Sequence, residues 1–368
     1  MDDVRYGVIG TGMMGVEHIE NLLALDGAAV RAVCDPHPPS LEAARSSLSA
    51  QAGPAAAEFS DHRALLDADL CDAVVVATPN NLHVGPVLDA VDAGLHVLVE
   101  KPLCTTVEDC RTLLGATEGR GPVVWVGLEY RYMPPVSRLV DEVRNGSVGT
   151  LRMLAIREHR FPFLTKVHHW NRFSANTGGT LVEKCCHYFD LMNLIVGTRP
   201  VRVYASGGQD VNHLDEVHDG RPSDILDNAY VVVDYDGGVR AMLDLCMFAE
   251  ATRNQEELVA VGDAGKVEAF IPESTIRIGR RGEHWIGSVS EEAVHDADIR
   301  HEGLHHGSSY LEHVDFLEAV RSGGPPKVTV EDGMWAVAMG LAAHRSIDEG
   351  RAIGMAELGP EFDTGSTE

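Results

Sequence analysis

The chain has 368 residues, 44% of them apolar, and carries 30 lysines and arginines against 56 aspartates and glutamates. This length exceeds what one hydrophobic core usually holds, so we expect two domains. The formal net charge of −26 repels nucleic-acid phosphates and anionic lipid headgroups, which argues against nucleic acids and membrane surfaces as partners.

Cysteine usage and the hydropathy pattern both bear on the cellular compartment. The seven cysteines are scattered and form no CxxC pair, so a disulfide framework is not expected. No basic leader precedes an apolar run, and no stretch reaches the ~18 apolar residues that a membrane helix needs. We therefore expect a cytoplasmic protein.

The first third of the chain alternates between short β-rich runs and apolar residues at helical spacing. This pattern is typical of βαβ units on a parallel sheet. Strands are expected at residues 6–10, 29–34, 57–59, 73–78, 96–100 and 123–126. We predict a doubly wound Rossmann domain over residues 1–127.

After Gly127 the pattern changes to longer strands separated by turn signals. Segments 229–235 and 239–245 flank Asp236-Gly237-Gly238 and predict a hairpin. Further strands are expected at 151–159, 201–207, 258–261, 267–270 and 275–278, with helices at 136–145, 310–321 and 332–349. We predict an α+β domain with a large open, mainly antiparallel or mixed sheet over residues 128–357, and a flexible tail at 358–368.

A glycine motif follows the first expected strand and opens a helix: Gly10-Thr11-Gly12-Met13-Met14-Gly15. Gly10 permits the tight turn, Gly12 lets backbone approach a pyrophosphate, and Gly15 lets the helix pack closely on the strand. The phosphates would then lie at the helix N-terminus, where free N–H groups favour an anion.

The second expected strand ends near Asp35, 20 residues beyond Gly15. A carboxylate there can accept hydrogen bonds from the adenosine ribose hydroxyls and repels the 2′-phosphate of NADP, so NAD is the predicted cofactor. The alternative is a turn carboxylate before the prolines that follow.

Two more segments follow strands of the same sheet: Thr78-Pro79-Asn80-Asn81-Leu82-His83 and Glu100-Lys101-Pro102. Ligands bind at the carboxyl ends of parallel strands. We therefore expect cofactor contacts from Thr78, Pro79, Asn80, His83, Glu100 and Lys101.

In the second domain, residues 178–190 read GGTLVEKCCHYFD. With the glycine motif, the acidic strand end and the TPNxxH and EKP segments, this stretch resembles the Gfo/Idh/MocA oxidoreductase family. The resemblance implies that Lys101, Glu183 and His187 are the catalytic residues. Glu183 stands where that family usually has aspartate, so its contact, to substrate or to His187, stays open.

Helical spacing independently predicts that Glu183, His187 and Asp190 share one helix face. The alternative is a polar face turned to solvent. Alcohol oxidation needs a proton acceptor, for which imidazole suits neutral pH, and a cation beside the developing alkoxide. We expect His187 and Lys101 to fill these roles, while Glu183 and Asp190 orient the imidazole or bind neighbouring hydroxyls.

Polar and aromatic residues before this segment suit a polyhydroxylated ring. Arg160, Lys166, His169 and Trp170 are the substrate candidates, the alternative being an interface or lid loop. Arg131, in a segment that resembles a family stretch near the nicotinamide, is a further cofactor candidate.

The histidine-rich segment at 300–306 and the pair Cys185-Cys186 lack the ligand spacing of a metal site, so no metal is expected. Adjacent cysteines on a helix point about 100° apart. His305 or His306 could instead reach the substrate pocket.

The resemblance implies an NAD(H)-dependent dehydrogenase that acts on a secondary hydroxyl of an inositol, sugar or glycoside. The alternative is an NAD-dependent glycosidase that oxidises its sugar transiently at C3 and eliminates the aglycone. A nucleotide-sensing regulator is disfavoured because the catalytic residues are present. The family often associates through the open sheet face, so we expect a homodimer or homotetramer.

Overall fold

The computed structural model describes residues 3–49 and 54–365. Its N-terminal part is a parallel six-stranded sheet with the order β3-β2-β1-β4-β5-β6. The strands are β1 (Val4–Ile9), β2 (Ala28–Cys34), β3 (Ala57–Phe59), β4 (Ala73–Val76), β5 (His96–Glu100) and β6 (Val124–Gly127). The strand order reverses between β1 and β4, which creates a crevice beyond their carboxyl ends where open α/β sheets bind ligands.

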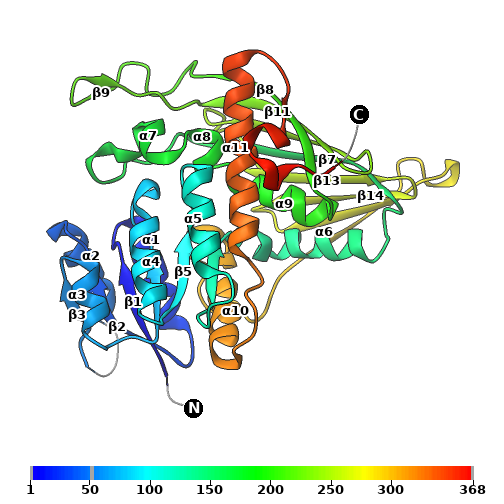
Figure 1. Ribbon diagram of the computed structural model, residues 1–368. Coiled ribbons are helices and arrows are strands. Elements are labelled where there is room, and N and C mark those ends of the chain that lie inside the picture. Colours follow the sequence, from blue (N-terminus) through cyan, green and yellow to red (C-terminus); the bar gives the residue numbers. More distant parts are fainter. Residues whose placement is uncertain (1–2, 50–53, 366–368) are drawn as a thin grey trace.

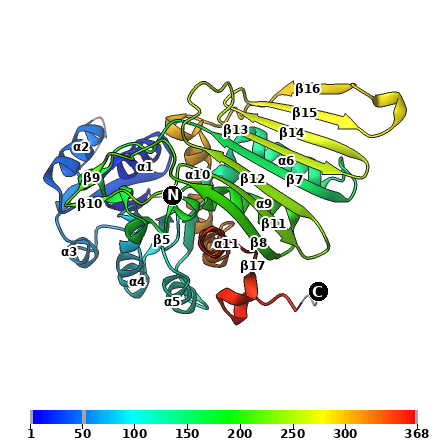
Figure 2. The same ribbon diagram turned by 90° about the horizontal axis from the view of Figure 1, so that it is seen from above.

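Helices cover both faces of this sheet. Figure 2 shows α1 and α2 on one side and α3, α4 and α5 on the other. Their bounds are α1 (Met13–Ala24), α2 (Pro38–Leu48), α3 (His62–Asp67), α4 (Val84–Asp92) and α5 (Val107–Thr117). Every residue of β4 is buried, as its continuous apolar sequence predicts for a strand covered on both sides.

The C-terminal sheet has the order β16-β15-β14-β13-β7-β12-β11-β8-β17. Only β7 and β12 pair in parallel among these described strands; the other neighbours are antiparallel. The strands are β7 (Leu151–His159), β8 (Pro200–Gly208), β11 (Asn228–Tyr235), β12 (Arg240–Cys246), β13 (Glu256–Gly262), β14 (Gly265–Ile271), β15 (Thr275–Arg280), β16 (Val289–Ala293) and β17 (Ile353–Gly354). The predicted fold class is confirmed.

One face of this sheet is covered by α6 (Pro134–Arg144), α9 (Cys186–Val196) and α11 (Val330–Glu349) (Figures 1 and 2). Along β11 the buried Val231 and Val233 alternate with Tyr230 and Val232, which are exposed on the other face. That alternation marks a sheet with one packed and one open side.

Helix α10 (Ser308–Ser322) comes from the second half of the sequence but packs against the Rossmann sheet. Phe316 packs edge-on against Trp125 with ring centroids 6.1 Å apart, and the Arg321 guanidinium donates to the Gly27 carbonyl at 3.1 Å. Helix α10 therefore packs against the Rossmann sheet although its sequence lies in the second predicted domain. The two predicted domains, 1–127 and 128–357, are in contact there.

The expected flexible tail is partly wrong. Residues Pro360–Phe362 form a short 3₁₀ helix, and Phe362 is buried in an edge-to-face contact with Trp335 at 4.8 Å. Glu361 also pairs with Arg111 at 2.6 Å. Burial of the Phe362 ring therefore anchors the tail as far as residue 362. The tail residues 366–368 lie outside the described residues.

The part of the chain that the structure describes contains no helix long and apolar enough to cross a membrane. All seven cysteines are unpaired thiols.

Candidate active site

A cavity of about 870 Å³ lies beyond the carboxyl ends of β1, β2, β4 and β5. Twelve of the residues singled out in the sequence line it: Gly10, Gly12, Met13, Met14, Asp35, Thr78, Pro79, Asn80, Glu100, Lys101, Lys166 and Trp170. The last two come from the loop after β7. The cavity is therefore bounded by both domains.

The three glycines of the motif have different steric surroundings. A Cβ on Gly10, whose φ is +90°, would lie 2.5 Å from the Ala77 carbonyl oxygen, and a Cβ on Gly15 would lie 2.0 Å from the Gly10 carbonyl oxygen. Both positions therefore require glycine. Gly12 has no atom within 4 Å of an added Cβ, and its missing side chain leaves room in the cavity wall for a pyrophosphate.

Asp35 lies at the far side of the same turn. Its Oδ2 accepts the Thr11 amide at 2.8 Å and its Oδ1 accepts the His37 amide at 2.8 Å. Each carboxylate oxygen keeps a further acceptor position, and the side chain lines the cavity. Together with the glycine turn this arrangement fits the adenosine and pyrophosphate end of NAD.

His83 lies behind the cavity wall. Its ring is fully buried, with Nδ1 3.0 Å from the Pro102 carbonyl and Nε2 3.0 Å from the Thr78 carbonyl. Burial lowers the pKa of His83, and a neutral ring donates from one of its two nitrogens at a time, while its position between the carbonyls keeps the two cavity loops together. The structure therefore places His83 as a brace between them.

Lys101 joins the two domains at the inner end of the cavity. Its Nζ donates to the Glu183 carbonyl at 3.3 Å. Burial would lower the pKa of Lys101, but electrostatic coupling to the neighbouring acidic groups of Cys186, Glu100 and Glu129 outweighs it and raises the pKa. Lys101 is therefore a cation in the site.

Glu100 precedes this lysine and is held on two sides. Its Oε1 lies 2.8 Å from His18 Nε2, and its Oε2 accepts the Lys101 amide at 3.0 Å. Burial favours the neutral acid, yet the hydrogen bond from His18 and the nearby positive charges lower the pKa of Glu100 to about 2. The carboxylate is thus ionised and fixes the backbone that carries Lys101.

The continuous helix expected across Glu183, His187 and Asp190 is wrong. The chain forms α8 (Thr180–Glu183), turns at Lys184 and Cys185, and resumes as α9. The turn accompanies the burial of the Lys184 ammonium, which lies 3.0 Å from Glu158 and 2.6 Å from the Tyr130 hydroxyl. The solvent-facing alternative is also wrong, because all three side chains are at most 3% exposed.

Glu183 contacts the loop lysine rather than His187. Its Oε1 lies 3.3 Å from Lys166 Nζ, whose ammonium also lies 4.6 Å from the centroid of the Trp170 ring. Its Oε2 is buried and has no hydrogen-bond partner among the described residues. A buried carboxylate oxygen without a donor requires one, and a substrate hydroxyl would supply it.

His187 lies deeper, against the end of β6. Its ring stacks on Tyr130 with centroids 3.9 Å apart and an interplanar angle of 7°. Nε2 lies 3.7 Å from Glu129 Oε1, and Nδ1 has no partner in the described structure. Burial and the charges of Lys101 and Lys184 lower the pKa of His187 well below its ordinary value, so the imidazole is neutral and can accept a proton.

Arg131 and Asp190 bind each other. Arg131 Nε donates to Asp190 Oδ2 at 2.6 Å, and the guanidinium also pairs with Asp332 at 3.3 Å. Arg131 was predicted to contact the cofactor, and Asp190 was predicted to lie beside the His187 imidazole. The contacts of the two residues include neither interaction. The pair instead ties η2 (Glu129–Tyr132) to α9 and α11, which anchors Glu129 and Tyr130.

Two substrate candidates, Arg160 and His169, contact other side chains outside the cavity. Arg160 pairs with Glu158 at 3.3 Å and lies 4.4 Å from the centre of the Phe161 ring. His169 stacks on His218 at 4.1 Å. Neither side chain lines the cavity, so Lys166 and Trp170 are the two of the four substrate candidates that do.

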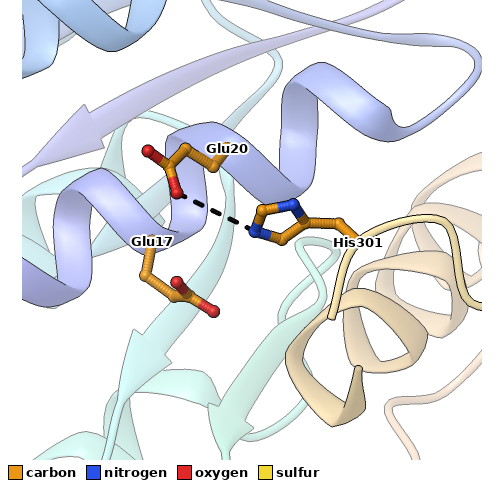
Figure 3. A group of neighbouring side chains, drawn as sticks. All are labelled: Glu17, Glu20 and His301. Atoms are coloured by element: carbon orange, nitrogen blue, oxygen red, sulfur yellow. Dashed lines mark ion pairs between the residues drawn. The ribbon is translucent and has the colours of Figure 1, made fainter. Parts of the chain in front are cut away.

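The histidine-rich segment meets α1. One carboxylate oxygen each of Glu17 and Glu20 and a ring nitrogen of His301 lie within 4.8 Å of one another (Figure 3). Glu17 Oε1 accepts the Leu304 amide at 2.9 Å, and His301 Nε2 lies 3.8 Å from Glu20. These contacts hold the segment against α1 and place His305 beside Glu129, with Nδ1 3.6 Å from Oε1.

Sequence reasoning missed Glu129, His18 and Lys184. Glu129 comes two residues after β6, so the rule that polar residues at the carboxyl ends of parallel strands form the site could have found it. His18 and Lys184 carry no such signal, because their roles depend on contacts across the molecule.

Comparison with known proteins adds an independent finding. A family model described as an oxidoreductase family with an NAD-binding Rossmann fold matches residues 4–128. A second, described as the C-terminal alpha/beta domain of an oxidoreductase family, matches residues 140–355. Together they account for most of the chain.

Individual relatives agree along nearly the whole length. A myo-inositol 2-dehydrogenase of Thermotoga maritima is 28% identical over 363 residues, covering 96% of this chain and 99% of its own. The crystal structure of a probable dehydrogenase from Thermotoga maritima superposes with a TM-score of 0.77 at 26% identity, covering 96% of this chain and 100% of its own. A levoglucosan dehydrogenase in complex with NADH has a TM-score of 0.82 at 20% identity, covering 96% and 99%; this last likeness concerns the fold alone.

Proposed function

Because the chain belongs to the Gfo/Idh/MocA family of NAD-binding oxidoreductases, as its motifs predict, we propose that it transfers a hydride between nicotinamide and a secondary hydroxyl of a cyclic polyol, sugar or glycoside. The Thermotoga maritima relative, named a myo-inositol 2-dehydrogenase, supports this substrate class.

The contact between Lys101 and Glu183 carries the proposal. Lys101 lines the cavity that fits NAD, and its ammonium reaches the backbone of the segment that bears Glu183 and His187. This one contact, at 3.3 Å, joins the cofactor domain to the residues that would handle the alcohol. NAD, when bound, supplies the hydride acceptor.

Side chains of the protein supply the other functions: charge stabilisation, proton transfer and substrate binding. The Lys101 ammonium stabilises the developing alkoxide, because a fixed positive charge in a site shielded from water acts strongly on charge that appears in the transition state. His187 accepts the hydroxyl proton as a neutral imidazole. Lys166 and the unpartnered oxygen of Glu183 bind neighbouring hydroxyls, and the Trp170 ring packs against the C–H face of the substrate.

Asp35 supports NAD over NADP. Its carboxylate lines the cavity and would accept the ribose hydroxyls, whereas a 2′-phosphate at the same place would meet a negative charge.

The test is a substrate panel. The pure protein is incubated with NAD and, in turn, with inositols, simple sugars and nitrophenyl glycosides, while NADH absorbance and nitrophenol release are followed together. Net NADH formation with a polyol or sugar is the expected result. Nitrophenol release without net NADH would replace the proposal with an NAD-dependent glycosidase, and no reaction with any compound would contradict both.

A further inference from the structure

Glu129 is a buried acid that the chemistry described above leaves unused. It begins η2, directly beyond β6, and is 2% exposed. Neither of its carboxyl oxygens has a hydrogen-bond partner among the described residues. Oε1 lies between two histidines, 3.7 Å from His187 Nε2 and 3.6 Å from His305 Nδ1.

His187 cannot keep a proton that it accepts. The ring is 1% exposed and stacked against Tyr130 at 3.9 Å, so water does not surround it. Lys101, Lys184 and Arg160 place positive charge around it, which together with burial lowers the pKa of His187 well below its ordinary value. An imidazolium formed there is unstable, and the proton needs an acceptor within reach of the ring.

Glu100 is not free to be that acceptor. Its two oxygens are occupied by His18 and by the Lys101 amide, at 2.8 Å and 3.0 Å. Glu129 is the carboxyl group in contact with the His187 ring, and its oxygens are unoccupied.

We propose that Glu129 takes the proton from His187 and passes it to His305, which releases it to solvent. This inference rests on the proposed oxidation of an alcohol. The hydroxyl O–H bond breaks as one ring nitrogen of His187 gains the proton, and the opposite nitrogen gives its proton to the Glu129 carboxylate. Glu129 then gives its proton to Nδ1 of His305 while the opposite ring nitrogen of this residue, whose side chain is 20% exposed, releases a proton to solvent. Burial and the charges of Lys184 and Lys101 lower the pKa of His305 to about 3, so this ring does not hold the proton either. The released proton balances the conversion of alcohol and NAD⁺ to ketone and NADH.

The surroundings of Glu129 give the relay a pH dependence. Glu100 and Lys101 approach it from the end of β5, Lys184 and His187 from the α8–α9 segment, Glu312 from α10 and His305 from η5 (Gly303–His305). Burial and the charge of Glu100 raise the pKa of Glu129 to about 8. Because only the ionised form accepts a proton, alcohol oxidation should accelerate as the pH rises through this region, and ketone reduction should slow.

The first experiment compares Glu129→Gln with the parent protein. With myo-inositol and NAD, or the panel compound that forms NADH, the rise of kcat between pH 7 and 9 should disappear, and kcat at high pH should fall on the order of 10- to 100-fold. The control is Glu312→Gln, an equally buried acid whose Oε1 accepts the Trp125 indole at 3.1 Å. It should keep the rise, with a shifted midpoint because Glu312 faces Glu129. A normal pH profile in Glu129→Gln would overturn the relay.

The second experiment needs no substrate or cofactor. Proteins with ¹⁵N-labelled histidine are titrated by NMR, and the His187 signals are assigned by their loss in His187→Asn. In the parent these signals should shift with an inflection near pH 8, in Glu312→Gln they should shift with an inflection at a displaced pH, and in Glu129→Gln the inflection should vanish. If it persists there, the coupling is absent and the relay is wrong, even if no polyol reduces NAD and the proposed function has failed separately.

A third variant tests the exit. His305→Ala should slow oxidation, and added imidazole should restore part of the rate, because the side chain reaches solvent and a small base can enter the space it leaves. A slow variant that imidazole does not restore would mean that His305 has only a structural role.

Discussion

His187 is the residue on which the proposed chemistry depends most. Its ring is buried beside Lys101 and Glu129, behind the cavity rather than in its wall. His187→Asn should therefore lower kcat on the order of 10²- to 10⁴-fold, the usual contribution of a proton-transfer group, while the dissociation constant for NAD changes little. Initial rates and calorimetric titration measure the two quantities. His284→Ala, at an exposed position on the β15–β16 connection, is the control; an active His187→Asn enzyme would remove His187 as the proton acceptor.

We expect Asp35 to set the preference for NAD over NADP. Its two oxygens accept the amides of Thr11 and His37 and would also accept the ribose hydroxyls. Asp35→Ser should weaken NAD on the order of tenfold or more, because hydrogen bonds to charged groups contribute about 1.5–3 kcal/mol, and should weaken NADP less or not at all. Calorimetry with both cofactors checks this. Asp26→Ser, an exposed acid, should change neither constant, and an unchanged NAD/NADP ratio in Asp35→Ser would refute the assignment.

Among the elements, β13 and β7 contain an unusual buried pair. Glu256 lies directly opposite Glu158 in the antiparallel register, and both are at most 2% exposed. Lys184 and Arg160 hold Glu158 at 3.0 Å and 3.3 Å. Burial and the charge of Glu158 raise the pKa of Glu256 to about 7, so the native protein keeps this proton where the unfolded chain has lost it.

The sign of the resulting pH effect is definite. Since the native state binds the extra proton, the stability due to neutral Glu256 is full below the unfolded pKa of about 4.3 and is lost as the pH rises toward 7, by roughly 1.4 kcal/mol per unit. Glu256→Gln should thus gain stability relative to the parent between pH 5 and 8, measured by urea unfolding. Glu257→Gln, which removes a partner of Arg157, is the control on the same strand. Identical pH dependence in the parent and Glu256→Gln would contradict the account.

The sequence predicted elements better than contacts between them. Apolar periodicity located the strands of the Rossmann sheet and seven of the nine strands of the second sheet. It missed β17, which has two residues, and β16, whose residues are all exposed and carry no apolar alternation. Three glycines with an acidic strand end located the cavity, because these features depend on local geometry. The break between α8 and α9 was not predictable from the local sequence: it coincides with the burial of Lys184 against Glu158, 26 residues away in the chain. The pairing of Arg131 with Asp190, and of His187 with Glu129, depends in the same way on how separate elements pack.

At the scale of the whole molecule, the open face of the nine-stranded sheet is the candidate surface for self-association. It carries a group of exposed apolar side chains on neighbouring strands: Met153, Tyr204, Tyr230, Val232 and Met242. Exposed apolar patches of this kind usually mark an interface. The proposed homodimer or homotetramer would bury it, as the family resemblance predicts.

Val232→Asp tests that assembly, because Val232 lies opposite both Tyr204 and Met242 in the sheet. The parent protein should sediment as an oligomer and the variant as smaller species, since a buried unpaired charge is costly. Ile286→Asp, which changes an exposed apolar residue on the β15–β16 connection, should leave the assembly intact. A parent protein that sediments as a monomer would contradict the proposal.

In the proposed reaction, a carbon-bound hydrogen of the alcohol moves directly to the nicotinamide. Its most direct test is mass spectrometry of the NADH formed from NAD and myo-inositol, or the reactive panel compound, deuterated at the carbons that bear its hydroxyls. Each NADH should gain one deuterium, and kcat/KM should fall with the labelled substrate. NADH without deuterium would contradict this direct transfer.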